Sequence, residues 1–229
     1  MNFIKNTLFT IIFSTAALLS LASRADALLI SSPDKEAKLL SAKTHNELNA
    51  RVIRLGINAY NNGVRRGVVR RKLLAIVDYS KPSTVRRFWI FDLTTHKILY
   101  HELVAHGVHS GGKHVTSFSN AHNSHKSSIG IYVTERTYQG KHNYSLRLRG
   151  LERGYNDNVK SRGVVIHSSH YVTNDFIRVA GQLGRSHGCL AINPRVTRGI
   201  IDTIKNGTII MVYHPDTTWA SRSVFLKSA

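Results

Sequence analysis

Cysteine is almost absent from this sequence of 229 residues, which contains only Cys189. A single thiol cannot close an intramolecular disulfide, so the fold must rely on its packed core. Glycines and a histidine surround the thiol within residues 183–190, a setting that favours reaction over packing. Cys189 is therefore a candidate catalytic nucleophile, and the alternative is a small buried hydrophobic side chain.

Acidic residues are also scarce, with 13 Asp and Glu against 32 Lys and Arg and a formal net charge of +19. A surface of this sign concentrates polyanions. The basic cluster at residues 65–66 and 70–72 has no nucleic-acid-binding motif and no interleaved aromatic residues, so nucleic acid is not an expected partner. For an exported chain, anionic polymers of the cell envelope are the candidate partner. A solvated basic face is the alternative.

Long apolar runs are missing except at the N-terminus. There Lys5 precedes the apolar stretch Leu8–Leu21, and Ala25-Asp26-Ala27 offers the small residues of a signal-peptidase site. The stretch is shorter than the roughly 20 residues that span a bilayer, which favours cleavage over a retained anchor. We expect residues 1–27 to be a signal peptide, the mature chain to be exported, and no transmembrane segment to remain after cleavage.

The mature chain fits one domain with an N-terminal extension, and it contains no internal repeat. Apolar residues at helical spacing predict one helix over residues 34–62, with Gly63 as its stop. Two more helices are expected, at residues 174–182 and 194–206. Strands are expected at residues 73–79, 88–93, 97–105, 127–134, 145–148, 163–166 and 208–213. Short strands with turns between them predict a mainly antiparallel sheet and an α+β fold.

The segment of residues 106–128 is rich in His, Ser, Gly and Asn and is long for a connection without regular structure. Such loops are usually functional or disordered. Gly107, Gly111 and Gly112 would give it hinges. We expect either a lid near the reactive thiol or a flexible surface loop.

A thiol attacks as the thiolate, and the pKa of a free cysteine is about 8.5, so a base must assist Cys189 near neutral pH. His187 lies two residues before it. His167 ends the apolar run of residues 163–166, which would hold its ring at the edge of a sheet. Because a base must be oriented as well as near, His167 is the better general base. The alternative is a histidine of the core.

A third group should orient the imidazole, but no carboxylate lies beside either segment; Asp157 and Asp175 are the nearest. A backbone carbonyl, such as that of Ser168, can accept the ring N–H instead. Gly188 lacks a side chain and would leave its own amide and that of Cys189 free to approach a substrate carbonyl. Those amides would form an oxyanion hole.

The pair of segments 165–167 (Val-Ile-His) and 184–189 (Gly-Arg-Ser-His-Gly-Cys) resembles the catalytic signature of the murein L,D-transpeptidase family, which has the YkuD-type fold. That signature is a histidine, a spacer, and then Ser/Thr-x-Gly-Cys. The resemblance covers roughly residues 73–215. Further stretches resemble the murein branch of the family: residues 78–83, 104–107, 116–120, 127–130, 138–142 and 145–148.

The resemblance implies a β-sandwich or barrel and an enzyme that acts on peptidoglycan stem peptides in the periplasm or cell envelope of a bacterium. The cysteine would attack the carbonyl between meso-diaminopimelate and D-alanine, and D-alanine would leave. The acyl group would pass to an amine of a second stem or to water. No metal or organic cofactor is implied. The domains would be a signal peptide (1–27), a helical extension (28–72), the catalytic domain (73–215) and a loose tail (216–229).

Carried over by motif position, Cys189 would be the nucleophile and His167 the base. The carbonyl of Ser168 would orient the base, and His187 with Gly188 would shape the oxyanion hole. Many family members carry arginine two residues after the cysteine, where this chain has Ala191. An anionic part of the substrate would therefore be bound elsewhere, and the candidates are Arg185 and Arg147.

Three other functions stay open. An L,D-carboxypeptidase would use the same residues with water as acceptor, and an envelope-binding protein could have lost the activity. A metal-binding protein would need three or four converging ligands, and no carboxylate set accompanies the histidines. The histidines considered for a metal site are His101, His106, His109, His114, His122 and His125.

Overall fold

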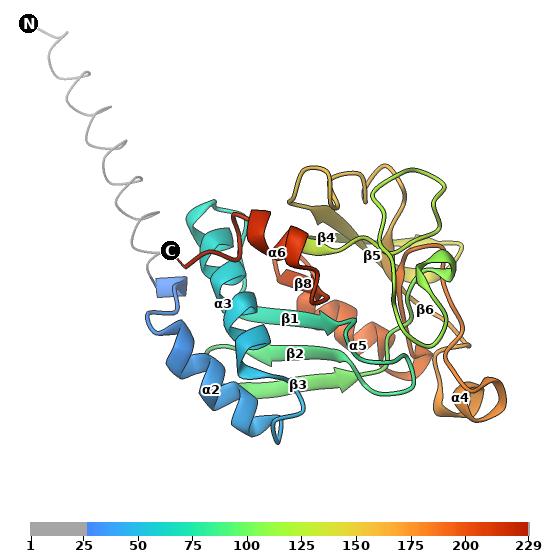
Figure 1. The fold of residues 1–229 in the computed structure, drawn as a ribbon, viewed down its shortest axis with the longest axis horizontal. Helices are drawn as coiled ribbons and strands as arrows, with labels where there is room; N and C mark the ends of the chain where they lie inside the picture. The colour runs from blue at the N-terminus through green and yellow to red at the C-terminus, as the bar shows by residue number, and fades with distance from the viewer. Residues whose placement is uncertain (1–26, 229) are drawn as a thin grey trace, which may run out of the picture.

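The computed structural model describes residues 27–228, so the expected signal peptide lies outside the described residues except for Ala27. Eight strands form one sheet in the order β3-β2-β1-β8-β4-β5-β6-β7, which curls into a near-barrel (Figure 1). Among the described residues, no helix has the length and apolar character needed to cross a membrane. The α+β fold class predicted from the sequence is confirmed.

The elements follow the predicted order, with one additional strand. The strands are β1 (Leu73–Asp78), β2 (Phe88–Asp92), β3 (Lys97–Glu102), β4 (Gly130–Gly140), β5 (Asn143–Gly150), β6 (Val165–Ser168), β7 (Leu190–Ile192) and β8 (Ile209–Tyr213). The helices are α2 (Pro33–Lys43), α3 (Ala50–Arg65), the 3-10 turn η1 (Val108–Ser110), α4 (Asn174–Ala180), α5 (Pro194–Ile204) and α6 (Thr217–Arg222). The additional strand is β7, which the sequence did not predict.

The sheet separates two cores. Every residue of β1 is buried, and successive side chains point to opposite faces. Leu74 and Ile76 join the core beneath α2 and α3, whereas Ala75 and Val77 join the core that includes α5. Five of the seven strand pairings are antiparallel, while β1 with β8 and β6 with β7 are parallel. The domain boundary after residue 72 stays a prediction.

The prediction of a single helix over residues 34–62 is wrong, because this stretch forms two helices, α2 and α3. His45 and Asn46 adopt positive φ values of 52° and 62°, which an α-helix cannot contain. Asn49 is the N-cap of α3, and its side chain accepts a hydrogen bond from the Arg51 amide at 2.8 Å. Gly63 is not a stop either. It lies inside α3, where a Cβ atom would stand 2.9 Å from the Ile209 side chain.

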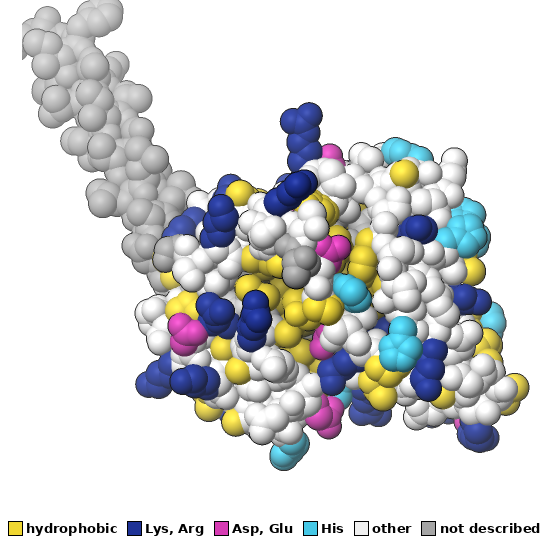
Figure 2. All heavy atoms as spheres, viewed as in Figure 1, with side chains coloured by type: hydrophobic (Ala, Val, Ile, Leu, Met, Phe, Trp, Pro, Cys, Tyr) yellow, Lys and Arg dark blue, Asp and Glu magenta, His cyan; other side chains and the backbone are white. Residues whose placement is uncertain are grey.

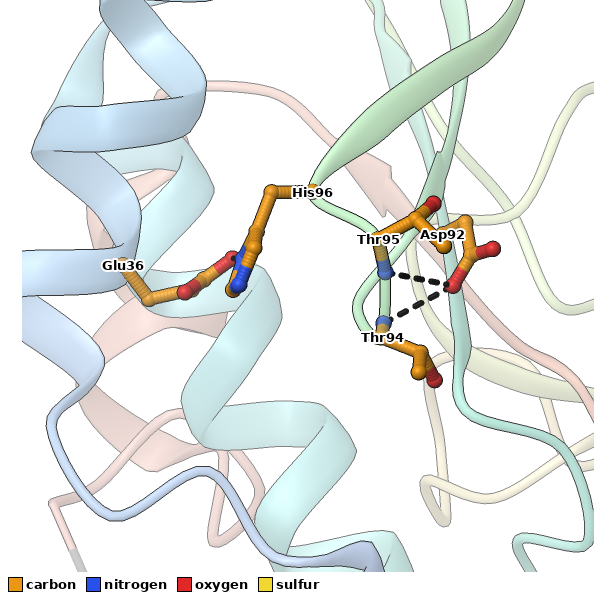
Figure 3. Close-up of polar contacts among 5 residues, drawn as sticks. All are labelled: Glu36, Asp92, Thr94, Thr95 and His96. Carbon is orange, nitrogen blue, oxygen red and sulfur yellow. Dashed lines mark hydrogen bonds and ion pairs between the residues drawn. The ribbon is translucent and has the colours of Figure 1, made fainter.

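The turn between β2 and β3 is fixed on both sides (Figure 3). Within the turn, the Asp92 carboxylate accepts from the amides of Thr94 at 2.8 Å and Thr95 at 3.3 Å. His96, at a positive φ of 54°, reaches across to α2, where its Nδ1 lies 2.7 Å from Glu36 Oε1. This contact ties the helical layer to the edge of the sheet.

The C-terminal segment is not a loose tail, which corrects the expectation from the sequence. Trp219, in α6, is fully buried. Its indole N–H donates to Glu152 Oε2 at 2.9 Å, and the Ile131 amide donates to the same oxygen at 2.7 Å. The Ser223 hydroxyl donates to the other carboxylate oxygen. Burial raises the pKa of Glu152, and these donors oppose that shift, so the segment satisfies a carboxyl group inside the core.

Replacing Trp219 should therefore destabilise the folded protein. We expect Trp219→Ala to lower the free energy of unfolding by about 3–5 kcal/mol, because it opens a cavity and removes a donor from a buried carboxyl. Urea denaturation followed by circular dichroism measures it. Arg222→Ala, an exposed change in the same helix, is the control. Equal midpoints for the two variants would mean that the tail carries no stability.

Candidate active site

The parallel pairing of β6 with β7 brings two distant stretches of chain together. Its register sets Ile166 opposite Leu190 and His167 opposite Ala191. Cys189 immediately precedes β7, so it lies beside the start of β6, two residues along the strand from His167. The connecting segment contains α4, as the sequence suggested. Periodicity could not reveal this pairing, because β7 has only three residues.

A cavity of about 540 Å³ lies at this end of the sheet, and both Cys189 and His167 line it. Cys189 is partly exposed, and its sulfur lies 3.8 Å from the carbonyl oxygen of Gly163. The alternative of a thiol packed among aliphatic side chains therefore does not describe this site. The other lining residues are His122, Asn123, His125, Tyr138, Lys141, His142, Ser161, Arg162, Gly163, Val165, Tyr171, Arg185, Ser186 and His187.

The ring of His167 is buried and oriented by its neighbour. Its Nδ1 lies 2.8 Å from the carbonyl oxygen of Ser168, so in the neutral ring Nδ1 carries the proton and donates it to that oxygen. The other nitrogen, Nε2, is then an acceptor. This is the contact expected of Ser168, while its part in catalysis stays a prediction.

Hydrogen bonds between the Ser186 side chain and the backbone fix the segment before the thiol. The Ser186 hydroxyl donates to the Cys189 carbonyl at 2.7 Å and accepts from the Gly188 amide at 3.1 Å. Gly188 has a φ of +109°, and a Cβ atom there would lie 2.7 Å from the Lys126 carbonyl oxygen, so only glycine fits. From the sequence we expected the amides of both Gly188 and Cys189 to be free for an oxyanion hole. That expectation is corrected, because Ser186 occupies the Gly188 amide.

The electrostatic environment favours a neutral thiol. Burial raises the pKa of Cys189. A backbone hydrogen bond from Val165 and the charges of Arg162 and Lys141 oppose this shift without reversing it. At neutral pH the resting sulfur therefore keeps its proton.

The same environment favours a neutral imidazole. Burial lowers the pKa of His167, and the Ser168 carbonyl opposes this shift. Nearby His142 and Lys141 lower the pKa further, because positive neighbours disfavour a second positive charge. His167 is thus neutral at neutral pH, with its proton on Nδ1 and with Nε2 free to accept a second proton.

Two of the other candidate residues reach the cavity. His187 is exposed and stacks on His125, with ring centroids 4.1 Å apart and planes 8° from parallel. Arg185 donates from Nη1 to the Gly111 carbonyl at 3.1 Å. Both side chains line the cavity beside the thiol.

Arg147 is not among the residues that line the cavity, which corrects its expected place there. Its guanidinium lies over the ring of Tyr138, 4.3 Å from the centroid, and Tyr138 does line the cavity. Arg147 therefore supports one wall from behind. The spacing of charges along β5 could not reveal that an aromatic side chain of β4 stands in between.

The segment of residues 106–128 forms a wall of the cavity, and whether it moves as a lid stays a prediction. His122, Asn123 and His125 line the cavity. Arg162 holds this wall with four hydrogen bonds, two of them to the carbonyl oxygens of Ser119 and Lys126. At Gly107 a Cβ atom would lie 2.4 Å from the His125 carbonyl oxygen, so that glycine serves close packing.

The sequence missed the contribution of the turn between β4 and β5. Lys141 and His142 occupy this turn, and both line the cavity. The ring of His142 stacks on that of His167, with centroids 4.2 Å apart and planes 20° from parallel. Residues 138–142 are among the stretches that resemble the murein branch of the family. Their sequence does not reveal that the pairing of β4 with β5 carries this turn to the cavity.

The described residues do not form a metal site. Within residues 27–228, no group of three or more His, Cys, Asp or Glu side chains could hold a metal ion. His109, His125 and His187 stack face to face, at 5.4 Å and 4.1 Å between centroids, so their nitrogens do not converge on one point. The metal-binding alternative therefore gains no support from this geometry.

Comparison with known proteins gives one consistent family. A family model described as the L,D-transpeptidase catalytic domain matches residues 44–213. No curated protein matches the chain.

Three solved structures illustrate the similarity. An L,D-transpeptidase from Mycobacterium smegmatis is 15% identical over 61% of this chain and 58% of its own, with a TM-score of 0.37. One from Stackebrandtia nassauensis is 11% identical over 82% and 95%, with a TM-score of 0.37. One from Enterococcus faecium is 15% identical over 61% and 48%, with a TM-score of 0.35. The chain thus spans less than two thirds of the first and third of these proteins.

The neutral thiol can be tested by alkylation. We expect the rate at which iodoacetamide labels Cys189 to rise with pH, with a midpoint above the value of about 8.5 for a free cysteine, because burial disfavours the thiolate. Mass spectrometry of the intact protein follows the label, and a short cysteine peptide is the reference. Fast labelling that is independent of pH between 5 and 8 would instead indicate a thiolate–imidazolium pair.

Proposed function

The chain belongs to the family of L,D-transpeptidase catalytic domains, and from this membership we propose that it is a murein L,D-transpeptidase whose nucleophile is Cys189. The observation that carries the proposal is the shared cavity of Cys189 and His167, with His167 oriented by the Ser168 carbonyl. A nucleophile, a base and an orienting group are the three parts that thiol catalysis needs. The substrate would be the stem peptide of peptidoglycan.

In the first step, Nε2 of His167 takes the proton from Sγ of Cys189 as the sulfur attacks the carbonyl between meso-diaminopimelate and D-alanine. The C–N bond then breaks, a thioester forms, and the amine of D-alanine leaves with the proton from His167. A neutral resting pair suits this order, because the base must be free when the substrate arrives. In the second step, an amine of another stem or a water molecule attacks the thioester carbonyl and gives a proton to Nε2 of His167. The C–S bond breaks, and the proton returns from His167 to the sulfur of Cys189.

The tetrahedral intermediate needs donors for its oxyanion. Since Ser186 occupies the Gly188 amide, the Cys189 amide is the main-chain donor in this proposal. His187, which lies on the cavity wall, would supply a second donor. Gly188 contributes by its positive φ and its lack of a side chain, which let the backbone before Cys189 pass close to the Lys126 carbonyl.

The place of action follows from the substrate. Murein lies outside the cytoplasmic membrane, so the proposal includes export through residues 1–27 as a cleaved signal peptide. The charge of the chain supports a partner of negative charge: on the face drawn in Figure 2, Lys and Arg side chains spread over α2 and α3 with few acidic ones between them. Anionic polymers of the envelope would be attracted to this surface.

The mechanism predicts the effect of two substitutions. Incubating the mature protein with a muropeptide that carries a tetrapeptide stem should release D-alanine, and Cys189→Ala should abolish the release. His167→Ala should lower the rate by about 10²–10⁴-fold, the range for a positioned proton-transfer group. The intact protein should carry an acyl adduct on Cys189 by mass spectrometry. His114→Gln, an exposed change, is the control.

Release that persists in Cys189→Ala would end the assignment of the nucleophile. Product analysis of the same digest separates two reactions that share this mechanism. A cross-linked dimer indicates transpeptidation, whereas a tripeptide stem alone indicates an L,D-carboxypeptidase.

A further inference from the structure

The cavity wall carries charge of one sign. Lys141, Arg162 and Arg185 line it together with five histidines, and no Asp or Glu is among its described lining residues. A site of this composition attracts carboxylates and repels cations. Of these three permanent cations, the one available to a carboxylate next to the reacting atoms is the one whose donors are not already engaged.

Arg162 is engaged on both terminal nitrogens. Nη1 donates to the Ser119 carbonyl at 2.9 Å and to the Ser128 hydroxyl at 2.6 Å, while Nη2 donates to the Lys126 carbonyl at 2.7 Å and to the Ser124 hydroxyl at 3.1 Å. These contacts hold the wall of the cavity. Its donors are used for structure and are not available to a ligand.

Arg185 is partly engaged, since its Nη1 donates to the Gly111 carbonyl. Lys141 differs from both arginines. Its side chain is exposed and makes no hydrogen bond or ion pair with any described residue. Its charge also reaches both reacting groups, because it lowers the pKa of Cys189 and of His167. Lys141 is thus a free ammonium beside the thiol and the imidazole.

The turn that carries Lys141 is held at the site. The strands around it pair up to Gly140 and Asn143, and Asn143 takes the left-handed conformation, with φ at 61°, that a tight turn needs. The stack of His142 on His167 fixes the turn from the other side. A carboxylate bound by Lys141 would therefore stand at a defined place relative to the scissile bond.

Position 191 cannot supply the cation instead. Ala191 is fully buried and packs with Leu103, Val172 and Leu183. A carboxylate near the thiol must consequently find its partner on another element, and the turn between β4 and β5 brings an unengaged cation to the cavity.

We propose that Lys141 is a specificity-determining residue that binds a carboxylate of the acyl-donor stem peptide next to the Cys189–His167 pair. This proposal rests on the proposed function for the identity of the donor. The ammonium contributes a charge-assisted hydrogen bond in a partly desolvated cavity, where it discriminates between a carboxylate and an amide.

A binding measurement that needs no turnover tests the proposal. In the Cys189→Ala background, calorimetry compares the tetrapeptide stem with the same peptide whose carboxylates are converted to amides. We expect Lys141→Gln to weaken binding of the carboxylate peptide about tenfold and to leave that of the amide peptide unchanged. Lys141→Arg should restore most of the affinity, and added salt should weaken the parent more than Lys141→Gln.

Lys97→Gln is the matched control, because Lys97 is exposed on β3, at the opposite edge of the sheet from β7. Binding that is unchanged by Lys141→Gln, or weakened equally for both peptides, would overturn the assignment of Lys141. The proposed function fails separately, through D-alanine release that persists in Cys189→Ala. Failure of the Lys141 assignment and failure of the proposed function can therefore be distinguished.

Discussion

The parallel pairing of β6 with β7 brings together two segments that are far apart in the sequence, one with His167 and one with Cys189. Once Ile166 stands opposite Leu190, the imidazole of His167 and the thiol of Cys189 must share one end of the sheet. The pairing is made from few residues, so its stability comes from the surrounding core. Ile166, Leu190 and Ile192 all belong to the cluster beneath α5, which anchors both strands from one side.

Behind this pairing lies a fully buried guanidinium, that of Arg87, which forms no ion pair with a carboxylate within residues 27–228. Arg87 donates to the Val104 carbonyl at 2.9 Å and 3.1 Å, to the Lys81 carbonyl at 2.8 Å, and to Nδ1 of His106 at 2.9 Å. Burial lowers the pKa of Arg87 to about 10, and burial together with Arg87 lowers the pKa of His106 to about 4. His106 is therefore a neutral acceptor. The network fixes residues 104–106 against Ala191 and Ile192, the residues that follow the thiol.

Local chemistry in the sequence was enough to predict the fold class, most strands and the contact of His167 with the Ser168 carbonyl, although His167 lies inside β6 and not at its end. It failed where the decisive contact is distant. The break at His45 and Asn46 has no glycine or proline to mark it, and the burial of Trp219 depends on Glu152, far away along the chain. The occupied Gly188 amide and the turn at Lys141 likewise depend on tertiary contacts that no spacing reveals.

In the described part of the chain no carboxylate contacts His167, which has a consequence for its chemistry. A carboxylate partner would orient the ring but would also raise its pKa and favour the charged form. The Ser168 carbonyl orients the ring without a net charge, while burial and the cations nearby lower the pKa of the ring and keep it neutral. If an anionic donor binds beside Lys141, its charge offsets that of the ammonium, and the pKa of His167 rises as the substrate arrives. The same offset would raise the pKa of Cys189, which Lys141 also lowers, so an anionic donor would make the base stronger and the thiol a weaker acid at the same time.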